Sequence, residues 1–183
     1  MQKKEFLITG ESLTVKNSVE AVLNNTKISL SSVSEKKILS SRKLVEKWIT
    51  KEEVIYGITT GFGEFKDVRI SQKDIEKLQK NLILSHSAGT GKYIPDFIVR
   101  LMLLFRINSL AKGYSGVRPE LVHHLIKIYN SGIIPLIPSQ GSVGSSGDLS
   151  PLAHLSLTII GEGYCKLEGG IIKSSDALSI KKI

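Results

Sequence analysis

Residues 141–154, GSVGSSGDLSPLAH, place three glycines and four serines in one short stretch that runs directly into an apolar segment. Gly147 has no side chain, so its backbone nitrogen can come unusually close to the carbonyl carbon of Ser145 in a tight turn. If that nitrogen attacked the carbonyl, and the new ring and Ser146 each lost water, the product would be a five-membered imidazolone with an exocyclic methylene. Such a ring is an electrophile, although composition alone favours an ordinary loop and helix N-cap.

The residues that follow the triplet suit such a ring. Asp148 comes directly after it and could assist the proton transfers of cyclisation. Ser150 and Pro151 begin a helix, and the free amide groups at the start of a helix favour negative charge on a nearby oxygen. A module that only binds an anion at residues 147–149 would use the same amides, so this alternative stays open.

Two other glycine motifs are excluded by their spacing. AGTGK at residues 88–92 resembles the end of a phosphate-binding P-loop, but His86 stands where the first glycine belongs and Tyr93 follows the lysine in place of Ser or Thr. The Gly-x-Ser-x-Gly pattern of serine hydrolases is also missing, because neither Ser145 nor Ser146 has a glycine two residues away on both sides.

Helix signals dominate the rest of the chain. Apolar residues recur at helical spacing, and Thr14, Ser71 with Asp74, Pro119 and Gly132 are typical of helix ends. The signals predict helices at about 14–23, 32–49, 71–89, 95–113, 119–132, 148–161 and 175–183. The last of these spans about two turns, too short to be stable alone, so we expect the complete protein to continue beyond it.

Two segments interrupt the helices. YGITTGFGEF at residues 56–65 is a second glycine-rich loop, and YCKLEGGIIK at 164–173 predicts a β-hairpin that turns around Gly169 and Gly170. The chain is therefore predicted to be mainly α, with its helices as a scaffold for two glycine-rich loops.

Composition and charge narrow the class of protein. With 183 residues and 41% hydrophobic content, the chain is long enough for one globular domain. Its net charge of +8 is scattered over helix faces and accompanied by few aromatic residues, which argues against a nucleic-acid partner. A single cysteine, Cys165, offers neither a disulfide nor a metal cluster, so we expect the cytoplasm. Arg100 and Arg106 interrupt the most apolar stretch well before the length of a membrane span.

Four blocks of the sequence together resemble one family. GSVGSSGDLSPLAH is similar to the GSVGASGDLAPLAH signature of the histidine and aromatic amino acid ammonia-lyases, whose Ala-Ser-Gly triplet becomes 4-methylideneimidazole-5-one (MIO). YGITTGFGEF resembles the tyrosine loop of that family, and LILSHSAGTG and LAKGYSGVRPELV, at 82–91 and 110–122, resemble its next two signature blocks. The blocks keep the order and spacing of the family over nearly the whole chain.

The resemblance implies a fold and an assembly. We expect residues 1–183 to form one domain, the N-terminal MIO-bearing part of the fumarase/aspartase-like helical fold of the ammonia-lyases, with short strands and a C-terminal β-hairpin. Members of the family run to several hundred residues, so their central and C-terminal helical regions are expected to be absent from this chain. They are homotetramers with active sites shared between subunits, and this chain is expected either to join a homo-oligomer or to need a complementary chain.

The family pattern assigns the electrophile residue by residue. Ser145, Ser146 and Gly147 would form the MIO group autocatalytically, and Asp148 would support the cyclisation. The resemblance implies no metal and no redox cofactor.

The same pattern assigns the substrate site. Tyr56 matches the tyrosine that takes the β-hydrogen of the substrate, a step that needs a phenolate-like base and an electrophile to activate the amine. Gly63, in the same loop, would let the backbone approach the substrate closely. His86 matches a histidine that contacts the substrate side chain, and an imidazole can hydrogen-bond to another imidazole or to a phenol hydroxyl. The expected partner is thus a small molecule, the amino acid substrate.

L-histidine, converted to urocanate and ammonia, is the substrate that we favour. Tyrosine ammonia-lyase or 2,3-aminomutase activity is the alternative, because Thr59 stands where the histidine enzymes have asparagine. A second departure, Ser145 in place of alanine, adds a hydroxyl to a residue that contributes only its carbonyl carbon to the ring. A third hypothesis is an inactive fragment that needs a complementary chain.

Overall fold

The structure, a computed structural model, describes residues 5–51, 53–60, 72–144 and 147–183. Its helices are α1 (Val15–Leu23), α2 (Ser32–Thr50), α3 (Gln72–His86), α4 (Asp96–Ala111), α5 (Pro119–Ser131), α6 (Leu149–Ile159) and α7 (Ser174–Lys181). Its strands are short: β1 (Phe6–Ile8), β2 (Ile28–Leu30), β3 (Thr90–Tyr93), β4 (Ile134–Pro135), β5 (Pro138–Gln140), β6 (Tyr164–Leu167) and β7 (Gly170–Lys173). The mainly α class predicted from the sequence is confirmed.

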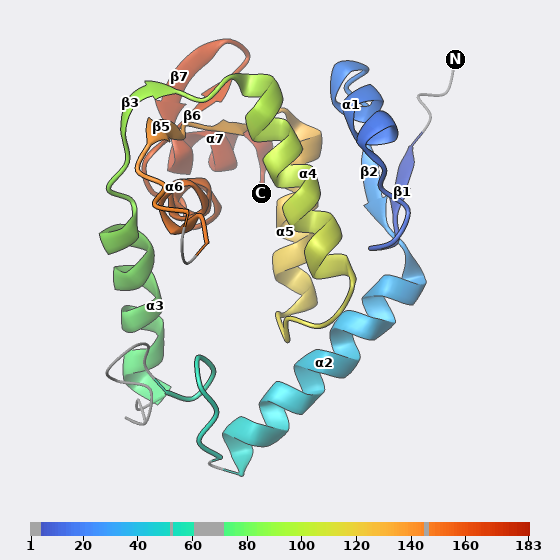
Figure 1. Cartoon of the computed structure of the whole chain (residues 1–183), viewed down its shortest axis with the longest axis vertical. Helices are drawn as coiled ribbons and strands as arrows, with labels where there is room; N and C mark the ends of the chain where they lie inside the picture. The colour runs from blue at the N-terminus through green and yellow to red at the C-terminus, as the bar shows by residue number, and fades with distance from the viewer. Residues whose placement is uncertain (1–4, 52, 61–71, 145–146) are drawn as a thin grey trace.

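Helix α4 lies at the centre of the hydrophobic core, with α5 packed along it (Figure 1). Its sequence is apolar around most of the circumference, as expected of a helix that α1, α2 and α5 cover from several sides. Leu103 and Ile107 are fully buried in one cluster with Leu125 and Ile128 of α5. Within the described ranges no helix, α4 included, is long and apolar enough to cross a membrane.

The predicted helix ends are confirmed where local hydrogen bonds define them. Thr14 caps α1 by accepting the Asn17 N–H, and the Asn17 side chain accepts the Thr14 N–H in return. Pro119 is the first residue of α5, and Gly132 ends that helix in the left-handed conformation, at φ 73°.

Helix α3 ends earlier than the sequence predicts. It stops at His86 and not at Gly89, because the AGTGK segment continues into β3, which pairs antiparallel with β5. Of the predicted helix start, Ser71 lies outside the described residues, and so does the side chain of Asp74. The β3–β5 pair brings the end of α3 next to the segment that opens the 141–154 stretch.

Strands β1 and β2 form a parallel pair that the sequence did not predict. Phe6 lies opposite Ile28 and Ile8 opposite Leu30, and α1 provides the crossover between them. The Asn130 side chain at the end of α5 continues the ladder: its Oδ1 accepts the Ile28 N–H at 2.9 Å and its Nδ2 donates to the Ile28 carbonyl at 2.8 Å. An amide side chain thus occupies the edge that a third strand would take.

The C-terminal hairpin is confirmed, with its turn one residue earlier than predicted. Strands β6 and β7 are joined by Glu168 and Gly169, at φ 52° and 87°, while Gly170 already belongs to β7. Two central residues with positive φ are typical of the type I′ turn that suits a two-residue hairpin. Strand β4 pairs with the other edge of β6, and Lys181 of α7 contacts the Glu168 carboxylate at 2.8 Å.

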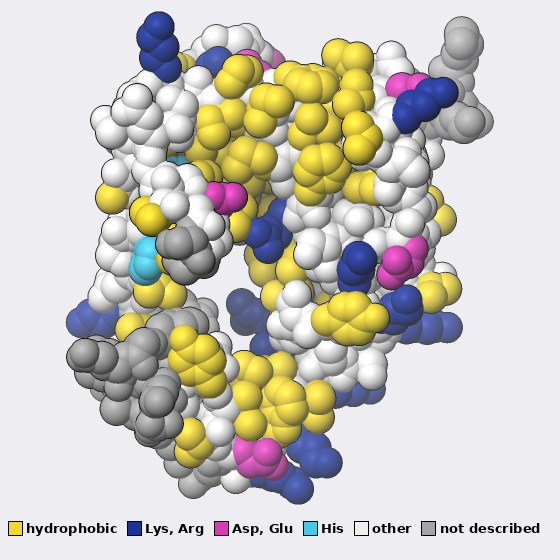
Figure 2. Space-filling view, in the orientation of Figure 1, with side chains coloured by type: hydrophobic (Ala, Val, Ile, Leu, Met, Phe, Trp, Pro, Cys, Tyr) yellow, Lys and Arg dark blue, Asp and Glu magenta, His cyan; other side chains and the backbone are white. Residues whose placement is uncertain are grey.

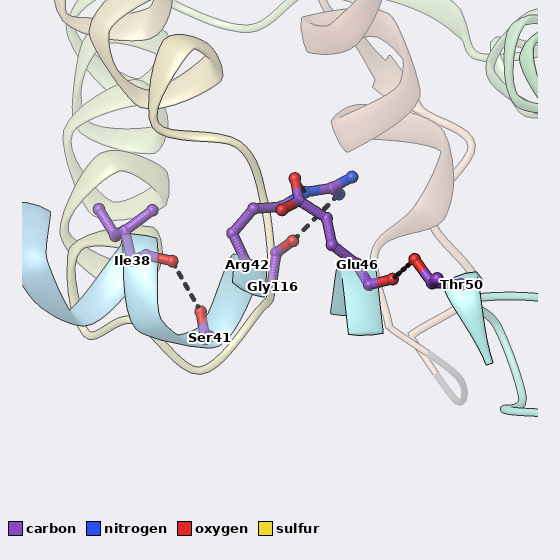
Figure 3. Close-up of polar contacts among 6 residues, drawn as sticks. All are labelled: Ile38, Ser41, Arg42, Glu46, Thr50 and Gly116. Atoms are coloured by element: carbon purple, nitrogen blue, oxygen red, sulfur yellow. Dashed lines mark hydrogen bonds and ion pairs between the residues drawn. The ribbon is translucent and has the colours of Figure 1, made fainter. Parts of the chain in front are cut away.

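Helix α2 runs from the core toward the lower end of the molecule and delivers the chain to the 53–60 turn (Figure 1). Arg42 holds its middle in place, with Nη1 donating to the Gly116 carbonyl at 3.5 Å and Nε donating to Glu46 at 2.9 Å (Figure 3). Gly116 has φ 63°, and a Cβ there would lie 2.4 Å from Val45 Cγ2. The helix therefore rests directly on the backbone of the α4–α5 loop.

Candidate active site

Two glycines with positive φ precede α6, one on each side of the two central serines. Gly144 and Gly147 flank the central serines at φ 77° and 92°, values that L side chains rarely adopt, and a Cβ at either would meet nothing within 4 Å. The Gly147 N–H donates to no described residue, while its carbonyl accepts the Leu149 N–H at 3.1 Å. Ser145 and Ser146 lie outside the described residues. Gly147, the described residue of the triplet, thus has a backbone conformation that favours glycine, and its N–H has no hydrogen-bond partner among the described residues.

Asp148 is the N-cap residue of α6, but its carboxylate does not cap that helix. Instead, Oδ1 accepts a hydrogen bond from the Ser142 hydroxyl. This bond closes the base of the 142–148 loop, so the carboxylate stays next to the triplet. The Asp148 carbonyl accepts the Leu152 N–H at 3.3 Å and begins the helix.

Two glycines, one after α3 and one before α6, bring the backbones of these two segments close together and against side chains of α6. A Cβ on Gly141, which has φ 139°, would lie 2.8 Å from the Ser150 hydroxyl oxygen and 2.9 Å from Gly89 Cα. A Cβ on Gly89 would lie 3.0 Å from His154 Nε2 and 3.1 Å from the Gln140 carbonyl oxygen. Both positions therefore need glycine for space. We call the contact of Gly89, Gly141 and His154 the glycine junction.

His86 is the last residue of α3 and is half-buried. Its Nδ1 lies 2.8 Å from the Leu82 carbonyl oxygen, and a carbonyl can only accept, so Nδ1 carries the proton in this contact. The Ser85 hydroxyl is a second, longer neighbour of Nδ1, at 3.3 Å. Nε2 contacts no hydrogen-bonding group of the described residues, so its lone pair is available to accept from a ligand.

Tyr56 lies in a turn that the hydroxyl of Thr59 organises. Thr59 is buried, donates to the Glu53 carbonyl at 2.6 Å and accepts the Ile55 N–H at 2.9 Å. Tyr56 itself is 63% exposed. Gly63, predicted in the same loop, lies outside the described residues. Thr59, which stands where the histidine enzymes have asparagine, thus uses its hydroxyl within the turn.

The turn with Tyr56 and the start of α6 face one opening from opposite sides. Figure 1 draws the 53–60 turn below α6, between α2 and the first part of α3. Figure 2 shows an opening through the molecule at this level, with α3 and α6 on one side and α4, α5 and α2 on the other. The elements that carry the predicted site residues, α3, the start of α6 and the 53–60 turn, thus lie around this opening.

The sequence model of the aromatic amino acid lyase family matches residues 13–183 of this chain. The chain belongs to the aromatic amino acid lyase family. A histidine ammonia-lyase of Caldanaerobacter subterraneus is 45% identical to it over 175 residues, which cover 96% of this chain and 34% of that protein. The chain spans about a third of the length of the curated relatives it matches.

Solved structures of the lyase family share the fold. An ergothionase of Treponema denticola superposes with a TM-score of 0.93 at 30% identity, over 98% of this chain and 36% of that one. A histidine ammonia-lyase of Trypanosoma cruzi superposes with a TM-score of 0.91 at 33% identity, over 98% and 34%. The ammonia-lyase fold predicted from the sequence blocks is confirmed.

One residue of the lyase signature had no assigned role from the sequence. His154 was as compatible with a structural role as with a functional one, and the structure places its Nε2 3.0 Å from the Gly89 nitrogen. His123 and His124, by contrast, lie apart from the 141–148 loop: His123 pairs with Glu35 at 3.0 Å, and His124 contacts the Ile159 carbonyl at 3.0 Å. Only a contact across the fold distinguishes these histidines, and no local pattern encodes it.

Proposed function

We propose that this chain is the N-terminal, MIO-bearing part of a carbon–nitrogen lyase that eliminates ammonia from L-histidine and yields urocanate. The observation that carries the proposal is His86, whose protonated Nδ1 is bound to its own helix and whose Nε2 is left as an acceptor. A substrate imidazole N–H can donate to such a nitrogen. Phenylalanine cannot, since its ring has no donor and would leave the half-buried acceptor without a partner. Histidine ammonia-lyases among the relatives support the same substrate.

Within this proposal, Ser145, Ser146 and Gly147 supply the MIO group. When formed, the group provides an electrophile that turns the substrate amine into a leaving group. Gly147 contributes the backbone nitrogen, and an added Cβ at this glycine would meet nothing within 4 Å. Asp148 holds its carboxylate at the base of the loop through Ser142, where it accepts and returns protons during cyclisation. The additional hydroxyl of Ser145 lies outside the ring and leaves the attacked carbonyl unchanged.

Tyr56 is proposed as the base for the β-hydrogen of the substrate. The phenolate oxygen takes that proton, the electron pair of the C–H bond forms the new Cα–Cβ double bond, and the Cα–N bond breaks to release ammonia. His86 orients the substrate ring from the opposite side of the opening, and Gly63 lets the tyrosine loop lie against the substrate. Because the base and the orienting group come from separate segments, both have to be placed by the assembled protein.

The assembly is proposed to be a homotetramer, completed by the remaining length of the polypeptide or by a complementary chain. Its support is the exposure of Tyr56, 63% in this chain, at the lower end of the molecule. The proposed compartment is the cytoplasm, in agreement with the single, unpaired Cys165. Light scattering of the complete enzyme tests the assembly. A mass of four chains supports the homotetramer, and a mass of one chain contradicts it.

The electrophile is tested by mass spectrometry of the peptide that contains residues 141–154 from the complete enzyme. We expect a mass lower than the sequence mass by two waters, and the full sequence mass in Ser146→Ala, which cannot form the methylene. An unmodified wild-type peptide would rule out the MIO group in this protein.

A tyrosine ammonia-lyase or 2,3-aminomutase is the second candidate, because a phenol hydroxyl can also donate to His86 Nε2. Incubation of the complete enzyme with each amino acid separates the candidates. Urocanate from L-histidine supports the main proposal, whereas coumarate or β-tyrosine from L-tyrosine replaces it. Turnover of neither amino acid, together with an unmodified triplet, would favour an inactive scaffold.

A further inference from the structure

We propose that His154 is a positioning residue, whose imidazole holds the backbone at Gly89, and through it His86, in register with the turn at the start of α6. This inference rests on the proposed function of His86 and of the residues 145–147. It adds a residue that neither contacts the substrate nor enters the ring, but that fixes the distance between the two parts that do.

The central contact is a hydrogen bond between two segments of the site. The Gly89 N–H donates to His154 Nε2 at 3.0 Å, across 65 residues of sequence. A nitrogen that accepts from an amide has to be unprotonated, so the proton of this imidazole is on Nδ1. Burial lowers the pKa of His154 and thereby favours this neutral, accepting form.

The glycine junction leaves this hydrogen bond little freedom. Gly89 does not have a positive φ, so its lack of a side chain reflects space: a Cβ would lie 3.2 Å from His154 Cδ2 as well as 3.0 Å from Nε2. On its other side, Gly141 approaches Gly89 closely enough that a Cβ there would lie 2.9 Å from Gly89 Cα. The Gly89 peptide is thus clamped between the imidazole of α6 and the backbone that enters the MIO loop.

The two segments joined by the clamp end in the residues that act on the substrate. His86 lies three positions before Gly89, at the end of α3. His154 lies on α6, a continuous helix whose N-cap is Asp148. Pairing of Thr90 with Gln140 fixes the strand that follows Gly89. The segment after α3 is therefore held by two partners: β5 pairs with Thr90, and α6 bonds the Gly89 amide through His154. Together they fix the position of the end of α3.

The role differs from that of an ordinary core histidine. His154 is only partly buried and is not part of the hydrophobic cluster around α4. Its hydrogen bond joins α6 to the segment that follows α3, whereas the comparable bond of His124, to the Ile159 carbonyl at 3.0 Å, joins α5 to the far end of α6. His124 is therefore a matched control: a half-buried histidine, bound to a backbone group, away from the glycine junction.

The test compares His154→Leu, which cannot accept a hydrogen bond, with His154→Gln, whose side-chain oxygen can, and with His124→Leu, all in the complete enzyme. We expect His154→Leu to raise KM for the amino acid by on the order of tenfold, because the hydrogen bond that holds Gly89 is lost. The change in kcat should be smaller. His154→Gln should recover most of the wild-type KM. The loss of two waters from residues 145–147 and the KM of His124→Leu should remain as in the wild type.

A second readout does not depend on activity. Hydrogen exchange of the Gly89 amide should be slow in the wild type and in His154→Gln, and fast in His154→Leu. If the wild type turns over no amino acid, the proposed function fails while this exchange measurement still decides whether His154 holds Gly89.

Two results would overturn the inference. One is a folded His154→Leu with the wild-type KM and slow Gly89 exchange. The other is a His154→Gln that is as impaired as His154→Leu. If His154→Leu does not fold, His154→Asn, whose side chain is shorter by one carbon than that of glutamine, takes its place.

Discussion

The glycine junction and the Tyr56 turn both carry residues of the proposed site, but they are held in different ways. The junction is fixed by contacts between distant segments, such as the bond from Gly89 to His154 across 65 residues. The Tyr56 turn is shaped by Thr59 through bonds to residues four and six positions away. The junction therefore depends on the tertiary fold for its geometry, whereas the shape of the turn follows largely from its own sequence and α2 sets its position.

The largest expected effect tests the chemistry of the turn. Tyr56→Phe in the complete enzyme removes the proposed base and should lower kcat by about 10²- to 10⁴-fold. The Thr59 hydrogen bonds to the Glu53 carbonyl and the Ile55 N–H should remain in this variant. Steady-state kinetics with L-histidine measures the loss, and circular dichroism checks the fold. A variant as active as the wild type would remove Tyr56 from the mechanism.

A stability measurement tests the junction. Gly141→Ala adds a Cβ 2.9 Å from Gly89 Cα at a φ of 139°, and should lower the free energy of unfolding by about 2–4 kcal/mol through strain and overpacking. Gly132→Ala is the matched control, since φ there is 73° and the added Cβ meets nothing within 4 Å. It should cost about 1 kcal/mol, the strain of the backbone alone. Urea unfolding of both variants gives the comparison, and equal costs would show that the junction is not tightly packed.

Thr59→Val probes the turn without changing its volume much. The substitution leaves the Ile55 N–H and the Glu53 carbonyl without their hydroxyl partner, at an expected local cost of about 1–3 kcal/mol. Since this loss is confined to the turn, hydrogen exchange should accelerate around residues 53–60 and stay unchanged at Gly89. Acceleration at both places would mean that the two regions unfold as one unit.

The smallest expected effect is a pH dependence specific to the junction. Burial lowers the pKa of His154 from the ordinary value of 6.5, so below that value the unfolded chain binds a proton more readily than the folded one. The contribution to stability is fully present above pH 6.5 and is lost as the pH falls from there through the lower folded pKa. Unfolding free energies are measured for the wild type and for His154→Gln, which does not titrate, and the wild type should lose stability relative to the variant as the pH falls through this range. A wild type that gains stability relative to His154→Gln toward acid would contradict the assigned protonation.

Features defined by neighbouring residues could be predicted from the sequence, and features defined by pairing could not. Thr14 and Pro119 mark helix starts because their hydrogen bonds or fixed φ act within one turn of the chain. Strands β1 and β4 have three and two residues, too few to show the alternation that predicts a strand. The end of α3 was predicted at Gly89 because the sequence could not show that β5 pairs with the segment that follows.

The same division applies to the site. The blocks around Tyr56, His86 and Asp148 indicate the family because their residue order is itself the signal. The side chain that joins two of these blocks, His154, is part of a block too, but its partner is a backbone amide, and any residue except proline has one. A sequence pattern identifies side chains only, so a hydrogen bond to the main chain can be found only in the structure.

The Asn130 side chain that completes the edge of β2 has a consequence for the order of events during synthesis. Ile28 and Asn130 are 102 residues apart, and a ribosome that adds about 5–20 residues per second needs on the order of 5–20 s to make that interval. During this time the edge of β2 has backbone groups without their final partner, and open edges of this kind invite pairing with other chains. The edge of β2, one of the first strands to be translated, therefore receives its final partner only after residue 130 has been made.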